Sequence, residues 1–589
     1  MEKKKQQKRG GYRMMSLLLV LVLCMGLLAG CSSSSDEEET AAEETQTLTG
    51  ETDTEEDSET DAEEDADEES SSGEHVENLV IGTLAENNVF NSQTQTDAFG
   101  RMNYNGLTQG NFVYRDENNE LQPYFWTSFE ISEDGTEIDF TMPLDAVWSD
   151  GEPVTMEDMV FTFEYMRDVK QVGSLQNLVE VEVTSEDSGT LIFSEPDAYY
   201  WINSSCMNTA HVYAKHIWEG VEDYESMTGD EAAVGCGPYR LVSYDTDSQT
   251  SYYEAIEEND YLGEITVDSV TVQSYSDETA LVMALISGEI DAMFNYANPI
   301  DATLIDTLEG VEDIDLGESE FSGFYQLEYG QYREPGDDQA FRIAVSYALD
   351  YEQLAVAING DYGTIPSKGV ISSTCKGYDD SIESLEYDVD KANELLDEAG
   401  YLDVDGDGYR ELPDGSEMDL SVLPQYSSTS MDMRLRIAEI VMNSLDEVGI
   451  KNHLDEENIA NDEIWEETVT NGDYDISITF TTSGMSAYST AFRYFMGELA
   501  EGESSWIWGT ITDDEFIDTY YAMTKAISDE DYIENCQKLQ QYMAENMCAQ
   551  ALCWETAFFP YRTDEYTGWI DYPSWGVINC ETWFTLTTK

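Results

Sequence analysis

Two kinds of apolar pattern alternate along the chain from residue 79 onward. Short runs that are apolar throughout, or apolar at every second position, predict β-strands. Longer stretches repeat their apolar residues about every three to four positions, which predicts amphipathic helices. Strands are expected at 79–83, 137–141, 267–273, 323–327 and 475–480, and helices at 155–165, 277–287, 341–349, 390–399, 433–448 and 529–545. Because strands and helices alternate, the pattern predicts an α/β fold.

The helix expected at 155–165 begins with a clear start signal. Thr155 stands at the N-cap and Asp158 at the third helical position, the two places that matter in a capping box. Shortly before it, Asp150-Gly151 is a dipeptide typical of turns. Residues 235–238 combine two glycines with a proline and predict a sharp turn into a strand. We therefore assign structural roles to these residues.

The first 31 residues have the layout of an export signal. A basic head at 1–13 is followed by an apolar run at 14–29. This run is shorter than the about 20 apolar residues that a membrane span needs. It ends in Leu28-Ala29-Gly30-Cys31, which resembles the lipobox of bacterial lipoproteins. The resemblance implies a lipoprotein signal peptide at 1–30 and a lipidated Cys31 as the mature N-terminus. The alternative is a plain secretory signal with an incidental cysteine.

The segment that follows, 31–77, predicts a disordered acidic linker. After Cys31 it consists mainly of Ser, Thr, Ala, Asp and Glu and has no Lys or Arg. Such a segment buries too little apolar surface to offset its ordering entropy, and about twenty like charges extend it. We interpret it as a spacer, with cation binding as the alternative. A lipid anchor with a spacer suits the extracellular face of a Gram-positive membrane.

Composition narrows the class of function. The formal net charge of −98 excludes nucleic acid as a partner, because phosphate contacts need clustered Lys and Arg. Of the 9 cysteines, Cys24 and Cys31 precede the mature body, and an odd number remains, so at least one is unpaired. The chain contains no Gly-x-Ser-x-Gly, no His-Glu-x-x-His and no phosphate loop. We therefore expect no enzyme and assign no catalytic residues.

Several local patterns occur in the order that is typical of one protein family. Residues 144–161, LDAVWSDGEPVTMEDMVF, closely resemble the signature of the family 5 extracellular solute-binding proteins, the peptide/nickel/opine-binding components of ABC importers. The other matching segments follow in the family's order. They are 211–218, 235–239, 287–291, 341–350, 387–392 and 395–401. The resemblance covers nearly all of residues 78–589.

The resemblance implies a two-lobed periplasmic-binding-protein type II fold that closes on its ligand like a hinge. The first lobe is expected to be discontinuous, comprising 78–326 and 546–589, with an extra subdomain at about 108–234. The second lobe is expected at 327–545. The chain would cross between the lobes at 323–327 and return at 549–554. Ligand would then lie between the lobes, against the ends of their strands.

The function implied is that of a substrate-binding lipoprotein that captures a small solute, short peptides in the first place, and delivers it to ABC permease subunits. We expect the protein to act as a monomer. In oligopeptide-binding members of the family, a carboxylate after the second-lobe strand holds the α-ammonium of the peptide. The matching segment here, 481–490, contains no acidic residue. An oligosaccharide ligand and a surface sensor that does not transport remain open as alternatives. Nickel is disfavoured, because the chain has only 4 histidines.

The ligand-binding residues expected from the resemblance come from three segments. The neutral hydroxyls after the strand at 475–480 suit a peptide backbone or a sugar. The loop after the first strand, the crossing near 325 and an aromatic residue further on complete the set. The expected residues are Asn91, Gln93, Thr94, Tyr325, Thr481, Thr482, Ser483, Tyr488 and Trp508.

One acidic stretch, 403–414, has the spacing of a calcium loop. Acidic residues stand at loop positions 1, 3, 5, 9 and 12, with glycine at position 6, as in an EF-hand, except that Asp414 replaces the usual bidentate Glu. Because aspartate is one methylene shorter, seven-fold coordination is harder to complete. We expect no required cofactor, and we keep Ca²⁺ at Asp403, Asp405, Asp407 and Asp414 as a hypothesis beside a hydrated turn.

Overall fold

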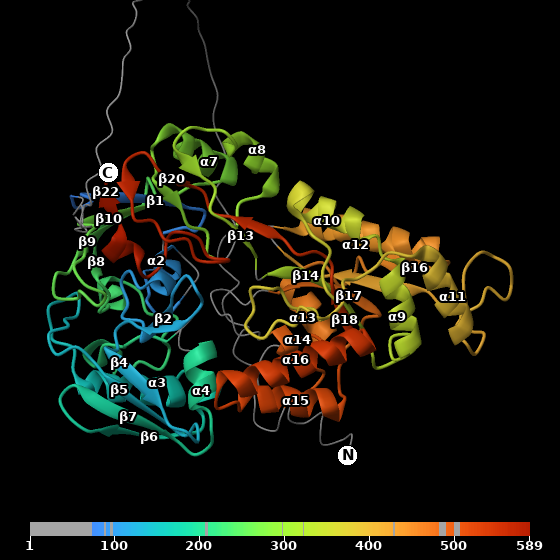
Figure 1. Cartoon of the computed structure of the whole chain (residues 1–589), viewed down its shortest axis with the longest axis horizontal. Helices are drawn as coiled ribbons and strands as arrows, with labels where there is room; N and C mark the ends of the chain where they lie inside the picture. Colours follow the sequence, from blue (N-terminus) through green and yellow to red (C-terminus); the bar gives the residue numbers. More distant parts are fainter. Residues whose placement is uncertain are drawn as a thin grey trace, which may run out of the picture. The chain divides into compact units, whose positions relative to one another are not determined.

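A computed structural model of the chain describes residues 74–87, 90–94, 98–205, 210–296, 299–321, 323–427, 430–481, 491–499 and 507–589 (Figure 1). The expected signal peptide, Cys31 and most of the acidic linker lie outside these residues. Residues 71–589 form one unit, and the description below concerns this unit alone.

A sheet of seven strands organises the first lobe. Its central strand β1 (Leu79–Thr83) is almost entirely buried and runs parallel to both neighbours, β10 and β11. Strand β20 comes from the end of the chain and pairs with β11, so Figure 1 shows its red ribbon close to the blue β1. The sheet order is β12 (Ile314–Asp315), β20 (Tyr561–Arg562), β11 (Ala292–Met293), β1, β10 (Ser269–Ser274), β9 (Thr250–Ala255) and β8 (Tyr239–Asp245).

A smaller sheet of four antiparallel strands carries an aromatic core. Its order is β4 (Ser128–Ile131), β5 (Glu137–Thr141), β7 (Ser188–Phe193) and β6 (Leu178–Val183). Trp126 stacks on Phe140 at 4.8 Å between ring centroids, and Phe112 stacks on Phe163 at 5.1 Å. Because Phe163 belongs to helix α3 (Met156–Asp168), this aromatic cluster joins that helix to the small sheet.

A second large sheet, of five strands, organises the second lobe. Its order is β16 (Asn452–Leu454), β15 (Leu420–Pro424), β17 (Ile476–Thr481), β14 (Phe324–Tyr329) and β18 (Ala549–Ala551). Strand β15 runs parallel to β16 and β17, whereas β14 is antiparallel to β17 and β18. Figure 1 shows α10 (Tyr351–Asn359) and α12 (Met431–Glu447) on one side of this sheet and α13 (Asp462–Asn471) on the other.

The remaining elements are short or peripheral. The helices are α2 (Ala98–Met102), α4 (Ala198–Tyr200), α6 (Lys215–Trp218), α7 (Glu278–Ser287), α8 (Ile305–Leu308), α9 (Gln339–Ala348), α11 (Val389–Ala399), α14 (Ala491–Tyr494), α15 (Asp514–Thr524), α16 (Asp529–Asn546) and α17 (Thr582–Thr585). The strands are β2 (Val113–Arg115), β3 (Leu121–Pro123), β13 (Glu318–Glu320), β19 (Thr556–Phe558), β21 (Tyr566–Thr567) and β22 (Thr587–Thr588). Among the described residues, no helix is long and apolar enough to cross a membrane.

The α/β class and all of the helices and strands expected from the apolar pattern are confirmed. The strands at 79–83 and 137–141 match residue by residue, whereas α3 runs to Asp168, three residues beyond its expected end. Strands β14 and β18 both pair within the second sheet along their whole length. The expected lobe boundaries, between residues 326 and 327 within β14 and between 545 and 546 before β18, stay predictions.

The turn at 235–238 has a steric origin. A Cβ atom on Gly235 would lie 1.9 Å from the carbonyl oxygen of Thr108, and one on Gly237 would lie 2.5 Å from the backbone nitrogen of Gln109. Glycine is needed at both positions because the backbone of residues 108–109 passes too close for any side chain. The sequence predicted the turn but not this close approach.

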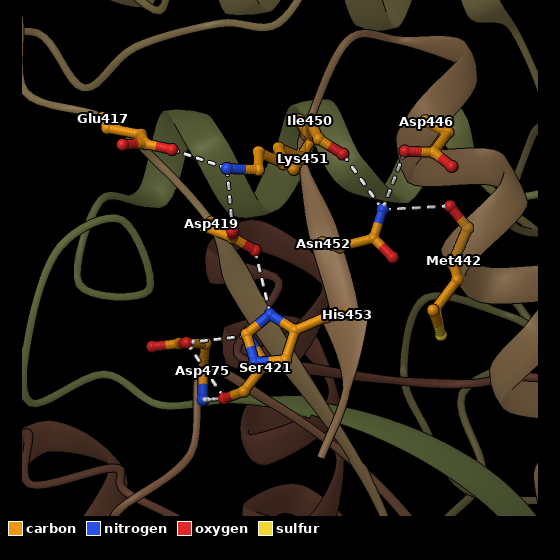
Figure 2. Close-up of polar contacts among 10 residues, drawn as sticks. All are labelled: Glu417, Asp419, Ser421, Met442, Asp446, Ile450, Lys451, Asn452, His453 and Asp475. Carbon is orange, nitrogen blue, oxygen red and sulfur yellow. Dashed lines mark hydrogen bonds and ion pairs between the residues drawn. The ribbon is translucent and has the colours of Figure 1, made fainter. Parts of the chain in front are cut away.

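The edge strand β16 is bordered by a network of charged side chains (Figure 2). Lys451 Nζ lies 2.5 Å from Glu417 Oε1 and 3.0 Å from Asp419 Oδ2. Asp419 also lies 2.9 Å from His453 Nδ1. Although partial burial alone would raise the pKa of Asp419, the hydrogen bonds from Lys451 and His453 hold it below its usual range. Such pairing of each base with several acids is the expected arrangement in so acidic a chain.

Candidate ligand-binding site

The second sheet has a topological switch point at the carboxyl ends of β15 and β17. The chain leaves β15 through α12 toward β16 on one side, and returns through α13 to β17 on the other side of β15. Ligands of open α/β sheets bind outside the carboxyl ends of the strands at such a point. Strand β14 begins at the same edge, because it is antiparallel to β17 and Phe324 pairs with Thr481.

Side chains with unmet bonding capacity gather at this edge. Tyr325, at the start of β14, contacts the ring of Phe480 at 5.0 Å and hydrogen-bonds Arg434 of α12. Burial, with a further contribution from Glu555, raises the pKa of Tyr325 to about 12. Thr481 ends β17 and is buried.

Glu555 lies where the chain returns from the second sheet. It follows β18, which runs antiparallel to β14 and therefore ends at the edge where β14 begins. Its Oε1 is buried and has no hydrogen-bond partner among the described residues. Burial, with a smaller contribution from Asp301, raises the pKa of Glu555 to about 8. A carboxyl in this state is ready to pair with a cationic group.

A second group of side chains lies beyond the carboxyl ends of two strands in the first sheet. The parallel strands β1 and β11 lead to Arg101 on α2 and to Tyr296, respectively. The Arg101 guanidinium lies 5.8 Å from the centroid of the Tyr296 ring. Tyr296 also contacts Tyr104 at 4.5 Å and Trp575 at 5.6 Å between ring centroids. These residues form an aromatic surface with one cationic group.

The two sets of strand ends are within electrostatic reach of each other. Burial raises the pKa of Tyr296, and Tyr494 of α14 raises it further. Tyr494 stacks on Trp508 at 4.5 Å, and the guanidinium of Arg493 lies 5.0 Å from the centroid of its ring. The first-lobe cluster around Tyr296 and the second-lobe cluster around Tyr494 therefore lie near one another. We call these two clusters, together with Tyr325, Arg434 and Glu555, the interlobe site.

The expected residues of the first-lobe loop have internal partners. The Asn91 side chain donates to the carbonyl oxygens of Tyr224 at 2.7 Å and Met227 at 2.9 Å, which gives it a structural role. Gln93 is buried and accepts from Lys170 Nζ at 3.0 Å. Thr94 closes a turn on Asn91. None of the described contacts brings these three to the interlobe site, and ligand contact by them stays a prediction.

The structure places Tyr325 and Thr481 at the same edge of the second sheet, in the neighbouring strands β14 and β17, whereas Trp508 belongs to a separate aromatic group of the second lobe. Trp508 packs between Tyr494 and Trp465, and its indole nitrogen is buried without a hydrogen-bond partner among the described residues. The expected residues Thr482, Ser483 and Tyr488 lie outside the described residues.

The acidic loop assembles a different set of ligands from the one expected. Carboxylate oxygens of Asp403, Asp405 and Glu411 lie within 4.8 Å of one another. Asp407 and Asp414 do not belong to this group, although all five acids accept hydrogen bonds from backbone nitrogens of the loop. Three oxygen ligands fit Ca²⁺ only in part, because this ion takes six to eight. Metal binding at Asp403, Asp405, Asp407 and Asp414 therefore stays a hypothesis.

Three of the four histidines have carboxylate partners. His75, His216 and His453 each lie within 3.0 Å of an aspartate oxygen. The six described cysteines are all buried. They are Cys236, Cys375, Cys536, Cys548, Cys553 and Cys580. A hollow of about 270 Å³ beside α16, lined by Lys368, Glu383, Gln541 and neighbouring residues, contains none of the expected ligand-binding residues.

Reasoning from the sequence missed Arg101, Arg434, Arg493 and Glu555. Each is one ordinary charged residue in a chain with 26 basic and 124 acidic residues. For two of these residues, the sequence contained a pattern from which their place at the strand ends could have been predicted. Arg434 and Arg493 each follow a buried strand, and the carboxyl ends of neighbouring parallel strands lie at one edge.

Comparison with known proteins agrees with this architecture. A sequence profile described as bacterial extracellular solute-binding proteins, family 5 Middle, matches residues 120–502. The dipeptide-binding protein of Escherichia coli is 24% identical over 386 residues, which are 62% of this chain and 68% of that protein. The chain spans 65% to 68% of the length of the curated relatives it matches first.

Two solved structures illustrate the range of ligands among proteins of this fold. The oligopeptide-binding protein AppA of Bacillus subtilis, in complex with a nonapeptide, has a TM-score of 0.66 and 20% identity, and the match covers 88% of this chain and 100% of that one. A mannohexaose-bound protein of Thermotoga maritima has a TM-score of 0.65 and 21% identity, with 87% and 99% covered. The fold is thus the two-lobed type II fold of periplasmic binding proteins. Because the profile matches more than half of the 589 residues, the chain belongs to the family 5 bacterial extracellular solute-binding proteins.

Proposed function

We propose that the protein is the substrate-binding lipoprotein of an ABC importer and that it captures short peptides between its lobes. The observation that carries the peptide assignment is the presence of unpaired groups of both signs around Tyr325. Glu555 offers a buried carboxyl oxygen, and Arg434 a buried guanidinium nitrogen, neither of which has a hydrogen-bond partner among the described residues. A free peptide carries an ammonium and a carboxylate, and each needs an opposite charge when water is excluded.

The proposal assigns to Glu555 the role for which residues 481–490 provide no acid. In this role its carboxylate receives the α-ammonium, while Tyr325, Thr481 and the strand ends bind the peptide backbone. Names of relatives support the substrate class, since they include a dipeptide-binding and an oligopeptide-binding protein. We expect no turnover of the ligand.

The proposal extends to the export and attachment of the protein. The signal peptide at 1–30, the lipidated Cys31 and the linker at 31–77 would place the lobes at the extracellular face of a Gram-positive membrane, where a monomer passes ligand to permease subunits. Release of the chain from membranes by lipase treatment, and its retention in the soluble fraction of a Cys31→Ala variant, would test this part.

The peptide assignment is tested with free and N-acetylated forms of the same peptides in a thermal-shift screen of the full-length chain. A ligand that binds only the folded state raises its melting temperature. The peptide that gives the largest shift is then titrated against the Glu555→Gln variant. We expect Glu555→Gln to weaken the free peptide at least about tenfold and the N-acetyl form little, since only the former brings a charge. Glu257→Gln, at an exposed glutamate, serves as the control.

An oligosaccharide is the second candidate, favoured by the stacked Tyr494 and Trp508 and by the mannohexaose-bound relative. Stacking on aromatic faces needs no charge. Stabilisation by mannohexaose, with no response to any peptide, would replace the peptide proposal with this one.

A further inference from the structure

Most basic residues in the described part of the chain are held by carboxylates. Lys451, with two acidic partners, is the example drawn in Figure 2. Lys525 likewise lies 2.9 Å from Glu195 and 2.5 Å from Asp197. With 124 acidic and 26 basic residues in the chain, a basic residue without an acidic neighbour is an exception that needs a reason.

Three such exceptions belong to the interlobe site. Arg101, Arg434 and Arg493 have no carboxylate partner among the described residues, and the Nε of each is buried without a hydrogen-bond partner. Arg434 is only 8% exposed, although its Nη1 donates to the carbonyl oxygens of Gln425 at 3.1 Å and Tyr426 at 3.0 Å. Each of the three lies against a tyrosine.

Their positions in the fold are related. Arg434 lies at the start of α12 and Arg493 in α14, the helices that follow the neighbouring parallel strands β15 and β17. Arg101 lies at the corresponding edge of the first sheet, beyond β1. Arg101 lies against the ring of Tyr296 and Arg493 against that of Tyr494, and Tyr494 is near enough to Tyr296 to raise its pKa. Among the described residues, Glu555 supplies the one carboxyl at this site whose buried oxygen has no hydrogen-bond partner.

A buried guanidinium without an anion is unfavourable, because it has lost water and gained no opposite charge. The planar guanidinium forms two parallel hydrogen bonds with one carboxylate, so a ligand with several carboxylates would satisfy these groups specifically. Three arginines exceed what the single α-carboxylate of a neutral peptide can satisfy.

We propose that the ligand is anionic and carries carboxylates beyond its α-carboxylate, so that an acidic peptide is the preferred substrate class. This inference rests on the proposed function. The arginines at 101, 434 and 493 set the preference locally, against the field of the acidic surface, which by itself favours cationic solutes.

The test uses two matched pools of random tri- to hexapeptides. In one pool Glu stands at two positions, and in the other Gln replaces both, which changes charge but hardly size. Thermal shift of the full-length chain is measured with each pool, and the best single peptide of each kind is then titrated by calorimetry. We expect the Glu peptide to bind at least tenfold more tightly than its Gln counterpart.

Variants connect the preference to the arginines. Arg101→Gln and Arg493→Gln should each weaken the Glu peptide about tenfold and leave the Gln peptide unchanged. Arg101 forms no hydrogen bond with any described residue, so its substitution removes no structural contact of that kind. Arg436→Gln, at an exposed residue on the same helix as Arg434, is the matched control and should change neither affinity.

The outcomes separate this inference from the function on which it rests. Equal binding of the Glu and Gln peptides would overturn the acidic preference and leave peptide binding intact. Unchanged affinities of both arginine variants for the Glu peptide would also overturn it. If neither pool stabilises the chain, peptide binding itself fails, and the acidic preference fails with it.

Discussion

Glu328 lies in the middle of the crossing strand β14 and is only 2% exposed. Its Oε1 accepts from Thr479 Oγ1 and from Gln326 Nε2, both at 2.8 Å, while its Oε2 has no partner among the described residues. Burial raises the pKa of Glu328 to about 7, even though these two hydrogen bonds lower it. This side chain is thus protonated in the folded protein at pH values where the unfolded chain has already lost the proton.

The first prediction follows from this difference in proton binding. Between about pH 4.5, the usual value for glutamate, and about pH 7, the folded state holds a proton that the unfolded state has released, so stability falls as pH rises. The slope is at most about 1.4 kcal/mol per pH unit. Glu328→Gln cannot ionise and should therefore be more stable than the natural chain at pH 8, by on the order of 2 kcal/mol, and equally stable at pH 5.

Urea melts at pH 5, 6.5 and 8 measure this effect, with Glu257→Gln as the exposed control. A Glu328→Gln variant that is less stable than the natural chain at pH 8 would contradict the prediction.

The acidic loop yields a second prediction at the same scale. If Asp403, Asp405 and Glu411 bind Ca²⁺, chelation by EGTA should lower the melting temperature, because bound metal offsets the repulsion among these carboxylates. Asp405→Ala should abolish the response to EGTA. Asp247→Ala, in another exposed acidic turn, should retain it. Identical melting curves with Ca²⁺ and with EGTA would leave the hydrated turn as the interpretation.

Many of the acidic residues stabilise the N-termini of helices. Aspartate side chains cap α7, α9, α10, α11 and α15 by accepting from backbone nitrogens of the first turn. A negative charge at this end is favourable because the helix dipole is positive there. In α3 the acid comes from inside the first turn. Asp158 accepts from the Thr155 backbone nitrogen at 2.9 Å and from its hydroxyl at 2.8 Å.

Asp158 also connects two elements, since its second oxygen accepts from the backbone nitrogen of Lys215, the first residue of α6, at 2.9 Å. Asp158→Ala leaves two backbone donors without partners and should lower the unfolding free energy by about 3 kcal/mol. The neighbouring Glu157 forms only an exposed ion pair with the Lys215 side chain, so Glu157→Ala should cost at most about 0.5 kcal/mol. Chemical denaturation measures both variants, and equal losses would argue against this role of Asp158.

At the scale of the whole molecule, a second set of contacts joins the four-stranded sheet to α15 and α16. Lys525, at the end of α15, pairs with Glu195 and Asp197, which follow the four-stranded sheet. Tyr199 also hydrogen-bonds Asp529 at the start of α16. A hinge movement that separates the lobes has to break these contacts, so they favour the closed state.

We therefore expect Lys525→Ala to weaken ligand binding by about two- to fivefold, which corresponds to about 0.5–1 kcal/mol for a partly exposed ion pair. The radius of gyration of the ligand-free chain, measured by small-angle scattering, should increase. Lys538→Ala removes an ion pair within α16 and should change neither quantity. A Lys525→Ala variant with unchanged affinity and radius would show that these contacts do not distinguish open from closed states.

The sequence by itself determined the local structure and the family of this protein. The strands at 79–83 and 137–141 and the capped helix after Thr155 follow from periodicity and from cap chemistry, which depend on neighbouring residues only. The order of the short motifs indicated the family, which the profile over residues 120–502 confirms.

Tertiary structure alone decided which side chains meet. Arg434 and Glu555 are far apart in the chain, and they come to one edge only because β15, β17 and β14 pair in the order that they do. In the first lobe, Asn91 likewise donates to the carbonyl oxygens of Tyr224 and Met227, which lie 133 and 136 residues further along the chain. The physical reason is that strand pairing, burial and the neutralisation of charge act between distant segments, and no local pattern records which basic residue will be left without an acidic partner.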